Sequence, residues 1–204
     1  MARSDSDLPL RERVPLAPLT TLGLGGPARY FLEARDDATL AAALRWAREE
    51  GTAATVLGGG SNVVVADAGV DGLAVRMAQR GVERHSGDRA REELWTVAAG
   101  EPWDALVERA VAAGLAGIEC LSGIPGTAGA TPIQNVGAYG QEVAEVVESV
   151  RVLDRATFEV REMPPEECAF AYRDSLFRRR PERFAVLAVT LRLTRGAEPA
   201  VRYP

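Results

Sequence analysis

The sequence contains no lysine: all 24 of its basic residues are arginine. Arginine suits bidentate recognition of phosphate or carboxylate groups. A coding bias toward Ala, Arg, Gly and Val explains the same composition more simply. With a net charge of -5, a pI of about 5.1 and no basic run beyond 178–180, nucleic-acid binding is disfavoured.

Cysteine and histidine are equally scarce. Two cysteines, Cys120 and Cys168, cannot form a disulfide framework, and neither has a partner at metal-ligand spacing. We therefore expect reduced, packed thiols and no metal site. The one histidine, His85, lies in a polar stretch that is typical of a solvated loop, which weakens any Ser-His-Asp hydrolase hypothesis.

Long hydrophobic runs are also missing. No run approaches the ~20 residues that a membrane-spanning helix needs, and residues 1–14 are polar, without the apolar core of a secretion signal. We expect a cytoplasmic protein with a loose segment over 1–14 and no membrane association. With 204 residues, 47% of them hydrophobic, the chain is long and apolar enough to bury a core.

Hydrophobic periodicity predicts two subdomains: a small α/β subdomain over 15–77 and a larger α+β subdomain over 78–204. In the first, Asp36 and Asp37 offer a helix cap and Gly51 a stop. The expected elements there are a helix over 38–50 and strands over 28–32, 55–57, 63–66 and 73–76. In the second, Pro102 opens a helix, and 184–194 alternates like a half-buried antiparallel strand. The other strands expected there are 82–85, 94–98, 146–154 and 157–163, the last two as a hairpin.

Three glycine-rich stretches are candidates for binding. The first, 23–28, matches the dinucleotide pattern G-x-G-x-x-A but precedes a predicted strand, so we interpret it as a turn. The second, 58–62, is either a plain tight turn or a loop whose N–H groups approach an anion. The third, 121–140, is either a disordered linker or backbone wrapped around a large flat ligand; Ile124, Ile133, Val136 and Tyr139 favour the ligand, because such residues favour burial.

A fourth stretch, AYRDSLFR, places Arg173 beside Tyr172, and arginine next to an aromatic ring can clamp a carboxylate. Together with TTLGLGGPARYF, LGGGSNVVVAD and GIPGTAGATPIQNVGAYGQEV, in the same order and at similar spacing, it resembles the UDP-N-acetylenolpyruvoylglucosamine reductase family. The resemblance covers nearly the whole chain from about Leu16.

The resemblance implies a two-subdomain, non-Rossmann FAD-binding fold of the vanillyl-alcohol-oxidase-like type, with NADPH as hydride donor and UDP-N-acetylglucosamine enolpyruvate as substrate. It implies no nucleic-acid, membrane or obligate protein partner. Arg173 matches the family's catalytic arginine, which binds the substrate carboxylate, and Tyr172 would help to shape the substrate pocket. The implied cofactor-binding residues are Gly58, Gly59, Gly60, Ser61, Asn62, Gly123, Ile124, Pro125, Gly126, Thr127, Gly129, Gln134, Asn135, Gly137, Ala138 and Tyr139.

In the family a further C-terminal substrate domain carries a catalytic serine and a catalytic glutamate, and no match for either is found in this sequence. We therefore expect a C-terminally shortened form with impaired activity of its own, in peptidoglycan precursor synthesis. Two alternatives stay open: a flavin-binding module or shortened paralogue that has lost the reaction, and a flavin oxidoreductase of the same fold that acts on another substrate.

Overall fold

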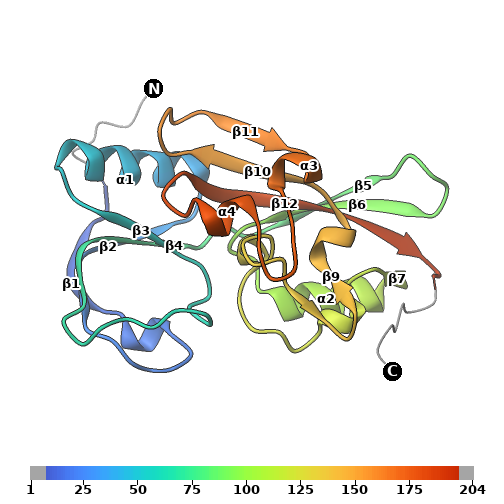
Figure 1. The fold of residues 1–204 in the computed structure, drawn as a ribbon, viewed down its shortest axis with the longest axis horizontal. Helices are drawn as coiled ribbons and strands as arrows, with labels where there is room; N and C mark the ends of the chain where they lie inside the picture. Colours follow the sequence, from blue (N-terminus) through green and yellow to red (C-terminus); the bar gives the residue numbers. More distant parts are fainter. Residues whose placement is uncertain (1–7, 198–204) are drawn as a thin grey trace. The chain divides into compact units, whose positions relative to one another are not determined.

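The computed structural model describes residues 8–197. The chain divides between Gln79 and Arg80 into two compact units, each built around its own sheet (Figure 1). None of the helices between residues 8 and 197 is long and apolar enough to cross a membrane.

The first unit is a four-stranded mixed sheet in the order β1-β2-β4-β3. Strand β2 pairs in parallel with β4, as β3 does, while β1 is antiparallel to β2. The elements are β1 (Arg11–Pro15), η2 (Ala17–Leu19), β2 (Pro27–Ala34), α1 (Asp37–Glu49), β3 (Ala54–Leu57) and β4 (Val70–Met77).

Helix α1 packs against β2 and β4 and forms, as the sequence predicts, after an aspartate cap (Figure 1). The side chain of Asp36 accepts a 2.6 Å hydrogen bond from the Thr39 N–H, which satisfies one of the unpaired donors of the first turn. Leu40, Leu44 and Ala47 are buried on the stripe that the 3.6-residue period predicts. The helix thereby covers one face of the sheet.

Two sequence expectations in this unit are wrong. Residues 63–66 form an irregular loop, because β3 and β4 are parallel and need a crossover; the Ala66 carbonyl pairs with the Gly26 N–H instead of a sheet neighbour. Arg11–Val14, expected to be loose, belong to β1, whose polar residues suit an exposed edge strand. Residues 8–10 belong to no helix or strand, and residues 1–7 lie outside the described residues.

The second unit is built on an antiparallel sheet in the order β11-β10-β12-β6-β5, with β7 also pairing with β12. Its strands are β5 (Val82–Ser86), β6 (Glu92–Ala98), β7 (Leu115–Ala116), β8 (Gly137–Ala138), β9 (Gln141–Glu142), β10 (Val147–Asp154), β11 (Val160–Met163) and β12 (Phe184–Arg195). Its helical segments are α2 (Trp103–Ala112), η3 (Glu119–Leu121), η4 (Ala128–Ala130), η5 (Val143–Glu145), α3 (Pro165–Cys168) and α4 (Leu176–Arg179).

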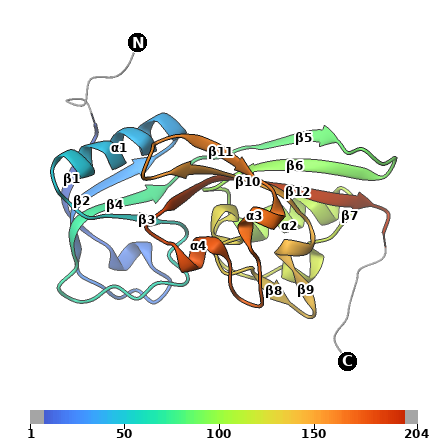
Figure 2. The ribbon, with the colours of Figure 1, turned by 45° about the horizontal axis from the view of Figure 1, so that its top comes forward.

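The core of this unit lies between the sheet and α2. Figure 2 shows α2 and the short β8–β9 pair on one side of the sheet. Trp95 and Trp103 are almost fully buried, and Nε1 of Trp103 donates to the Leu121 carbonyl at 3.1 Å. That bond ties the start of the third glycine-rich stretch to the helix, because a buried indole N–H needs a partner.

Strand β12 is more central than its alternation indicates. It pairs with both β10 and β6, and Ala185–Val189 are buried on both faces rather than one. The predicted 157–163 strand begins later, at Val160, because Asp154 accepts hydrogen bonds from the N–H groups of Ala156 and Thr157 and closes a turn there.

Candidate functional site

The loop 58–62 follows β3 in the first unit. Gly60 is buried with φ 71°, its carbonyl accepts from the Thr21 N–H at 3.0 Å, and a Cβ there would collide with the Leu19 carbonyl. Packing alone therefore explains the glycine at 60. Gly59, in contrast, is exposed, so its backbone is open to a ligand.

The loop 122–129 of the second unit is fixed at one end by Asp104, in the first turn of α2. Oδ1 of Asp104 accepts hydrogen bonds from the Gly123 N–H at 2.6 Å and from the Ser122 hydroxyl at 3.0 Å. The Gly123 N–H is the main reason that the pKa of Asp104 lies below its usual value. Gly123 has φ 77°, which a residue with a side chain rarely adopts.

The other end of this loop runs against residues 99–103. The N–H groups of Ala128 and Gly129 donate to the carbonyls of Glu101 and Ala99, each at 2.9 Å. A Cβ at Gly129 would collide with Ala99, so the backbone segments can lie this close only with glycine there. Thr127 lies between these anchors, and its buried hydroxyl has no partner among residues 8–197.

The Tyr172–Arg173 pair forms the tip of a tight turn. Ala171 and Asp174 exchange two backbone hydrogen bonds, of 3.0 and 3.1 Å, across it. Arg173 has φ 52°, a conformation that is uncommon for a residue with a long side chain and that recurs at functional sites. The turn is held on its far side by Ser175, whose hydroxyl donates to the Ile133 carbonyl at 2.6 Å and caps α4.

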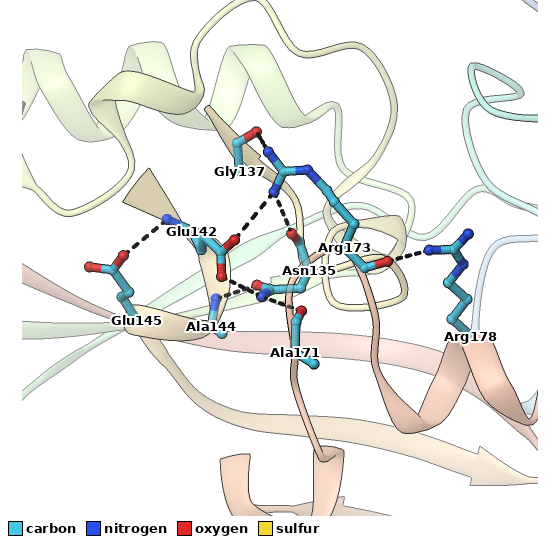
Figure 3. A network of polar contacts seen from close by, with 8 residues as sticks. All are labelled: Asn135, Gly137, Glu142, Ala144, Glu145, Ala171, Arg173 and Arg178. Atoms are coloured by element: carbon cyan, nitrogen blue, oxygen red, sulfur yellow. Dashed lines mark hydrogen bonds and ion pairs between the residues drawn. The ribbon is translucent and has the colours of Figure 1, made fainter. Parts of the chain in front are cut away.

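The guanidinium of Arg173 reaches back to the glycine-rich stretch (Figure 3). Nη1 donates to the Asn135 carbonyl at 3.2 Å and lies 3.5 Å from Glu142, and Nη2 donates to the Gly137 carbonyl at 2.5 Å. Its side chain is 37% exposed. Of the five N–H donors of a guanidinium, two therefore have no partner among residues 8–197.

Asn135 is an internal support of this network. Its side chain is buried, with Nδ2 donating to Glu142 at 2.7 Å and to the Ala171 carbonyl at 3.0 Å, while Oδ1 accepts from the Ala144 N–H at 3.1 Å. The whole residue is only 1% exposed, and its carbonyl accepts from Arg173.

The structure thus brings Asn135, Gly137 and Arg173 together in one network. Gly123, Gly126, Thr127 and Gly129 lie on the loop beside α2, where Ile124 packs partly against the core, as Ala138 does farther along. Within the glycine-rich stretch Leu121, Ala128 and Val136 are buried, whereas Ile133 and Tyr139 are 39% and 63% exposed.

Two residues that the sequence analysis did not single out have central places here, Asp104 and Glu142. Asp104 has the ordinary pattern of an acidic residue in a first helical turn. Glu142 forms a capping box with Glu145 around η5, so the spacing E-x-x-E of this segment was the available signal. No group of three His, Cys, Asp or Glu residues within the described chain is placed to hold a metal ion.

The comparisons with known proteins show the family and the fold. The profile of the FAD binding domain family matches residues 28–163. A vanillyl-alcohol-oxidase-type flavoprotein from Myceliophthora thermophila C1 has the same fold at 18% identity, with a TM-score of 0.58 over 83% of this chain and 32% of that one. The chain therefore belongs to the FAD binding domain family, and its fold is of the non-Rossmann flavoprotein type that the family resemblance implied.

Proteins with higher sequence identity to this chain have the name of one particular enzyme. UDP-N-acetylenolpyruvoylglucosamine reductase of Streptomyces avermitilis is 51% identical over 191 residues, which cover 93% of this chain and 51% of that protein. The enzyme of the same name from Pseudomonas aeruginosa is 46% identical over 92% of this chain and 55% of its own length. The crystal structure of the Thermus caldophilus reductase gives a TM-score of 0.74 at 34% identity, over 91% of this chain and 64% of that one. The chain spans about half the length of the curated relatives it matches.

The residues present fit FAD. The unpartnered, buried hydroxyl of Thr127 lies in the loop that the resemblance assigns to the cofactor, and a buried polar atom without a partner costs free energy that a ligand can recover. In the first unit Gly59 is exposed, so its backbone is open to a ligand. FAD is thus the cofactor that both the family and the loops indicate.

Proposed function

We propose that this chain is the flavin-binding part of an NADPH-dependent reductase that converts UDP-N-acetylglucosamine enolpyruvate into UDP-N-acetylmuramate. The proposal rests on the hydrogen bonding of the Arg173 guanidinium. Asn135, Gly137 and Glu142 hold this group in place, and two of its N–H donors have no partner among the described residues. Two donors are what bidentate binding of a substrate carboxylate needs.

Bound FAD would supply the hydride-transfer chemistry, accepting hydride from NADPH and passing it to the enolpyruvyl double bond. Gly58–Asn62 would hold the pyrophosphate through backbone N–H groups. The residues 123–127, 129, 134, 135 and 137–139 would line the rest of the cofactor. Thr127 adds a hydroxyl that no residue of the described chain engages.

Arg173 acts on the substrate. Hydride addition to the enolpyruvyl group builds negative charge next to its carboxylate, and a positioned guanidinium stabilises that charge as it develops. Tyr172, whose side chain is 80% exposed with the Arg173 guanidinium 5.0 Å from the centre of its ring, would form one wall of the substrate site. The acid that protonates the intermediate is a role we assign to no residue of this chain.

The proposed reaction is a step of peptidoglycan precursor synthesis, on which cell-wall growth, cell shape and cell division depend. We propose that the protein carries it out in the cytoplasm. We expect the 204-residue chain alone to show little substrate-dependent turnover, since general acid catalysis contributes about 10²–10⁴-fold. The alternative of a flavin-binding module without the reaction keeps the same loops, so only a substrate-dependent measurement separates the two.

That measurement is a titration of the FAD-loaded chain with UDP-N-acetylglucosamine enolpyruvate, read as a change in the visible flavin spectrum. We expect a saturable change in the wild type and in Arg161→Ala, which removes an arginine from an exposed ion pair with Glu167 on the β11–α3 side. Arg173→Ala should abolish the change while FAD remains bound. An equal response in Arg173→Ala would contradict the assigned role, and no response in any variant would favour the module.

A further inference from the structure

We infer that Glu142 is a positioning residue for Arg173, an inference that rests on the proposed function for its catalytic meaning. The carboxylate of Glu142 lies at the junction of three segments in Figure 3: the 135–137 stretch, the start of η5 and the Arg173 turn. Its two oxygens have different partners. Oε1 lies 3.5 Å from Nη1 of Arg173, and Oε2 accepts a 2.7 Å hydrogen bond from Nδ2 of Asn135.

The carboxylate is itself held in place. It accepts from the Glu145 backbone N–H as the cap of η5, while the Glu145 side chain accepts from the Glu142 backbone N–H at 3.3 Å. These reciprocal bonds fix the backbone from which Glu142 projects. At 30% exposure its side chain is partly shielded, so its attraction for the guanidinium is stronger than that of a fully exposed pair.

The consequence for Arg173 is a defined orientation. Nη1 lies between the Asn135 carbonyl and Glu142, and Nη2 donates to Gly137, so three contacts on the two terminal nitrogens stop the planar group from rotating. The guanidinium can then meet a carboxylate without first losing side-chain freedom, which would otherwise weaken binding. Glu142 touches neither reacting atoms nor substrate in this scheme; it acts through Arg173.

The test follows the Arg173 side chain directly by NMR of the FAD-loaded chain labelled with ¹⁵N-arginine. The Arg173 signals are assigned by their loss in Arg173→Lys. Restricted rotation about the Nε–Cζ bond gives separate Nη1 and Nη2 signals, whereas fast rotation about that bond averages them. We expect separate signals in the wild type and averaged signals in Glu142→Gln, which removes the charge from the contact with Arg173.

Glu145→Gln is the matched control, because it changes the same capping box without touching Arg173; its Arg173 signals should stay separate. If Glu142→Gln fails to fold, Glu142→Asp keeps the charge and the capping group but falls one methylene short of Arg173, and averaging is again expected. Separate Arg173 signals in a folded Glu142 variant would overturn the inference.

The outcome is independent of the reaction. Averaged signals in Glu142→Gln together with an absent substrate response in the wild type would support the positioning role and reject the proposed function. Unchanged signals with a normal substrate response would do the reverse. A substrate dissociation constant that falls in Glu142→Gln would also overturn the inference, since it would mean that Glu142 competes with the substrate for Arg173.

Discussion

Nη2 of Arg173 donates a 2.5 Å hydrogen bond to the carbonyl of Gly137, and a Cβ at Gly137 would lie 2.5 Å from Nη1 of the same guanidinium. The glycine therefore both binds the arginine and leaves room for it. A Cβ would also lie 2.9 Å from the Gln141 carbonyl, a backbone atom that cannot swing aside. The place of the guanidinium thus depends on a missing side chain.

Gly137→Ala should displace Arg173 and lower the free energy of unfolding by about 1–3 kcal/mol, as overpacking does. Thermal melting and the substrate-induced flavin spectrum measure the two effects. Gly114→Ala is the control, because it introduces backbone strain at φ 71° with no atom within 4 Å of the new Cβ. It should be less stable but keep the substrate response; an intact response in Gly137→Ala would show that the arginine tolerates the methyl group.

Replacing Gly59 with leucine should abolish or strongly weaken FAD binding while unit 1 stays folded, because this glycine is exposed and the bulky side chain would block backbone approach to the pyrophosphate. Gly60→Ala should behave differently: its Cβ collides with the Leu19 carbonyl, so it should unfold more easily. Melting curves with and without FAD distinguish the two. Unchanged FAD affinity in a folded Gly59→Leu would mean that the loop is only a turn.

Asp104→Ala should weaken FAD binding by freeing Gly123 and Ser122, whose conformation the carboxylate sets. Asp104→Asn keeps an acceptor oxygen and should fall between wild type and alanine, because a charged acceptor makes the stronger hydrogen bond. Fluorescence titration with FAD ranks the three proteins. Equal affinity in all three would show that the loop needs no support from α2.

Stability should fall in acid through Glu93. Hydrogen bonds from Arg84, Trp95 and Arg195 lower its pKa to about 2, against an ordinary value of 4.5. A carboxylate with a lowered folded-state pKa stabilises the fold above its unfolded pKa, and the contribution is lost as the pH falls from about 4.5 toward 2. On this partly exposed strand the effect is on the order of 1 kcal/mol. Denaturant unfolding of wild type and Glu93→Gln across that range should converge at the acid end; parallel curves would contradict the assignment.

Much of the fold follows from local sequence, and the failures have a common cause. Helix α1 has a capping aspartate, an apolar stripe and a stop, so each of its features was predictable. Residues 63–66 have the local pattern of a strand. They form a loop because β3 pairs with β4 in parallel, and no local sequence pattern indicates that pairing. The buried second face of β12 depends in the same way on its two neighbours.

The candidate site likewise has a part that the sequence predicts and a part that it does not. The glycine-rich stretches and Arg173 stand out in the sequence through composition and resemblance. The part that Glu142 plays does not, because it depends on a turn 31 residues away bringing Arg173 to its carboxylate. The side-chain bonds of Asn135 to Glu142, Ala144 and Ala171 are equally invisible in the sequence, because they join segments up to 36 residues apart. Residue type locates such a region; the contacts within it come only from the fold.

The central claim is that this chain binds FAD, and the most direct measurement is the visible absorption spectrum of the purified protein after incubation with FAD and desalting. We predict a yellow protein with flavin bands, a melting temperature that rises with added FAD, and complete release of the flavin on acid denaturation, since none of the loops assigned to the cofactor contains a His or Cys for a covalent link. A folded protein that stays colourless, with no FAD-dependent rise in melting temperature, would contradict the account.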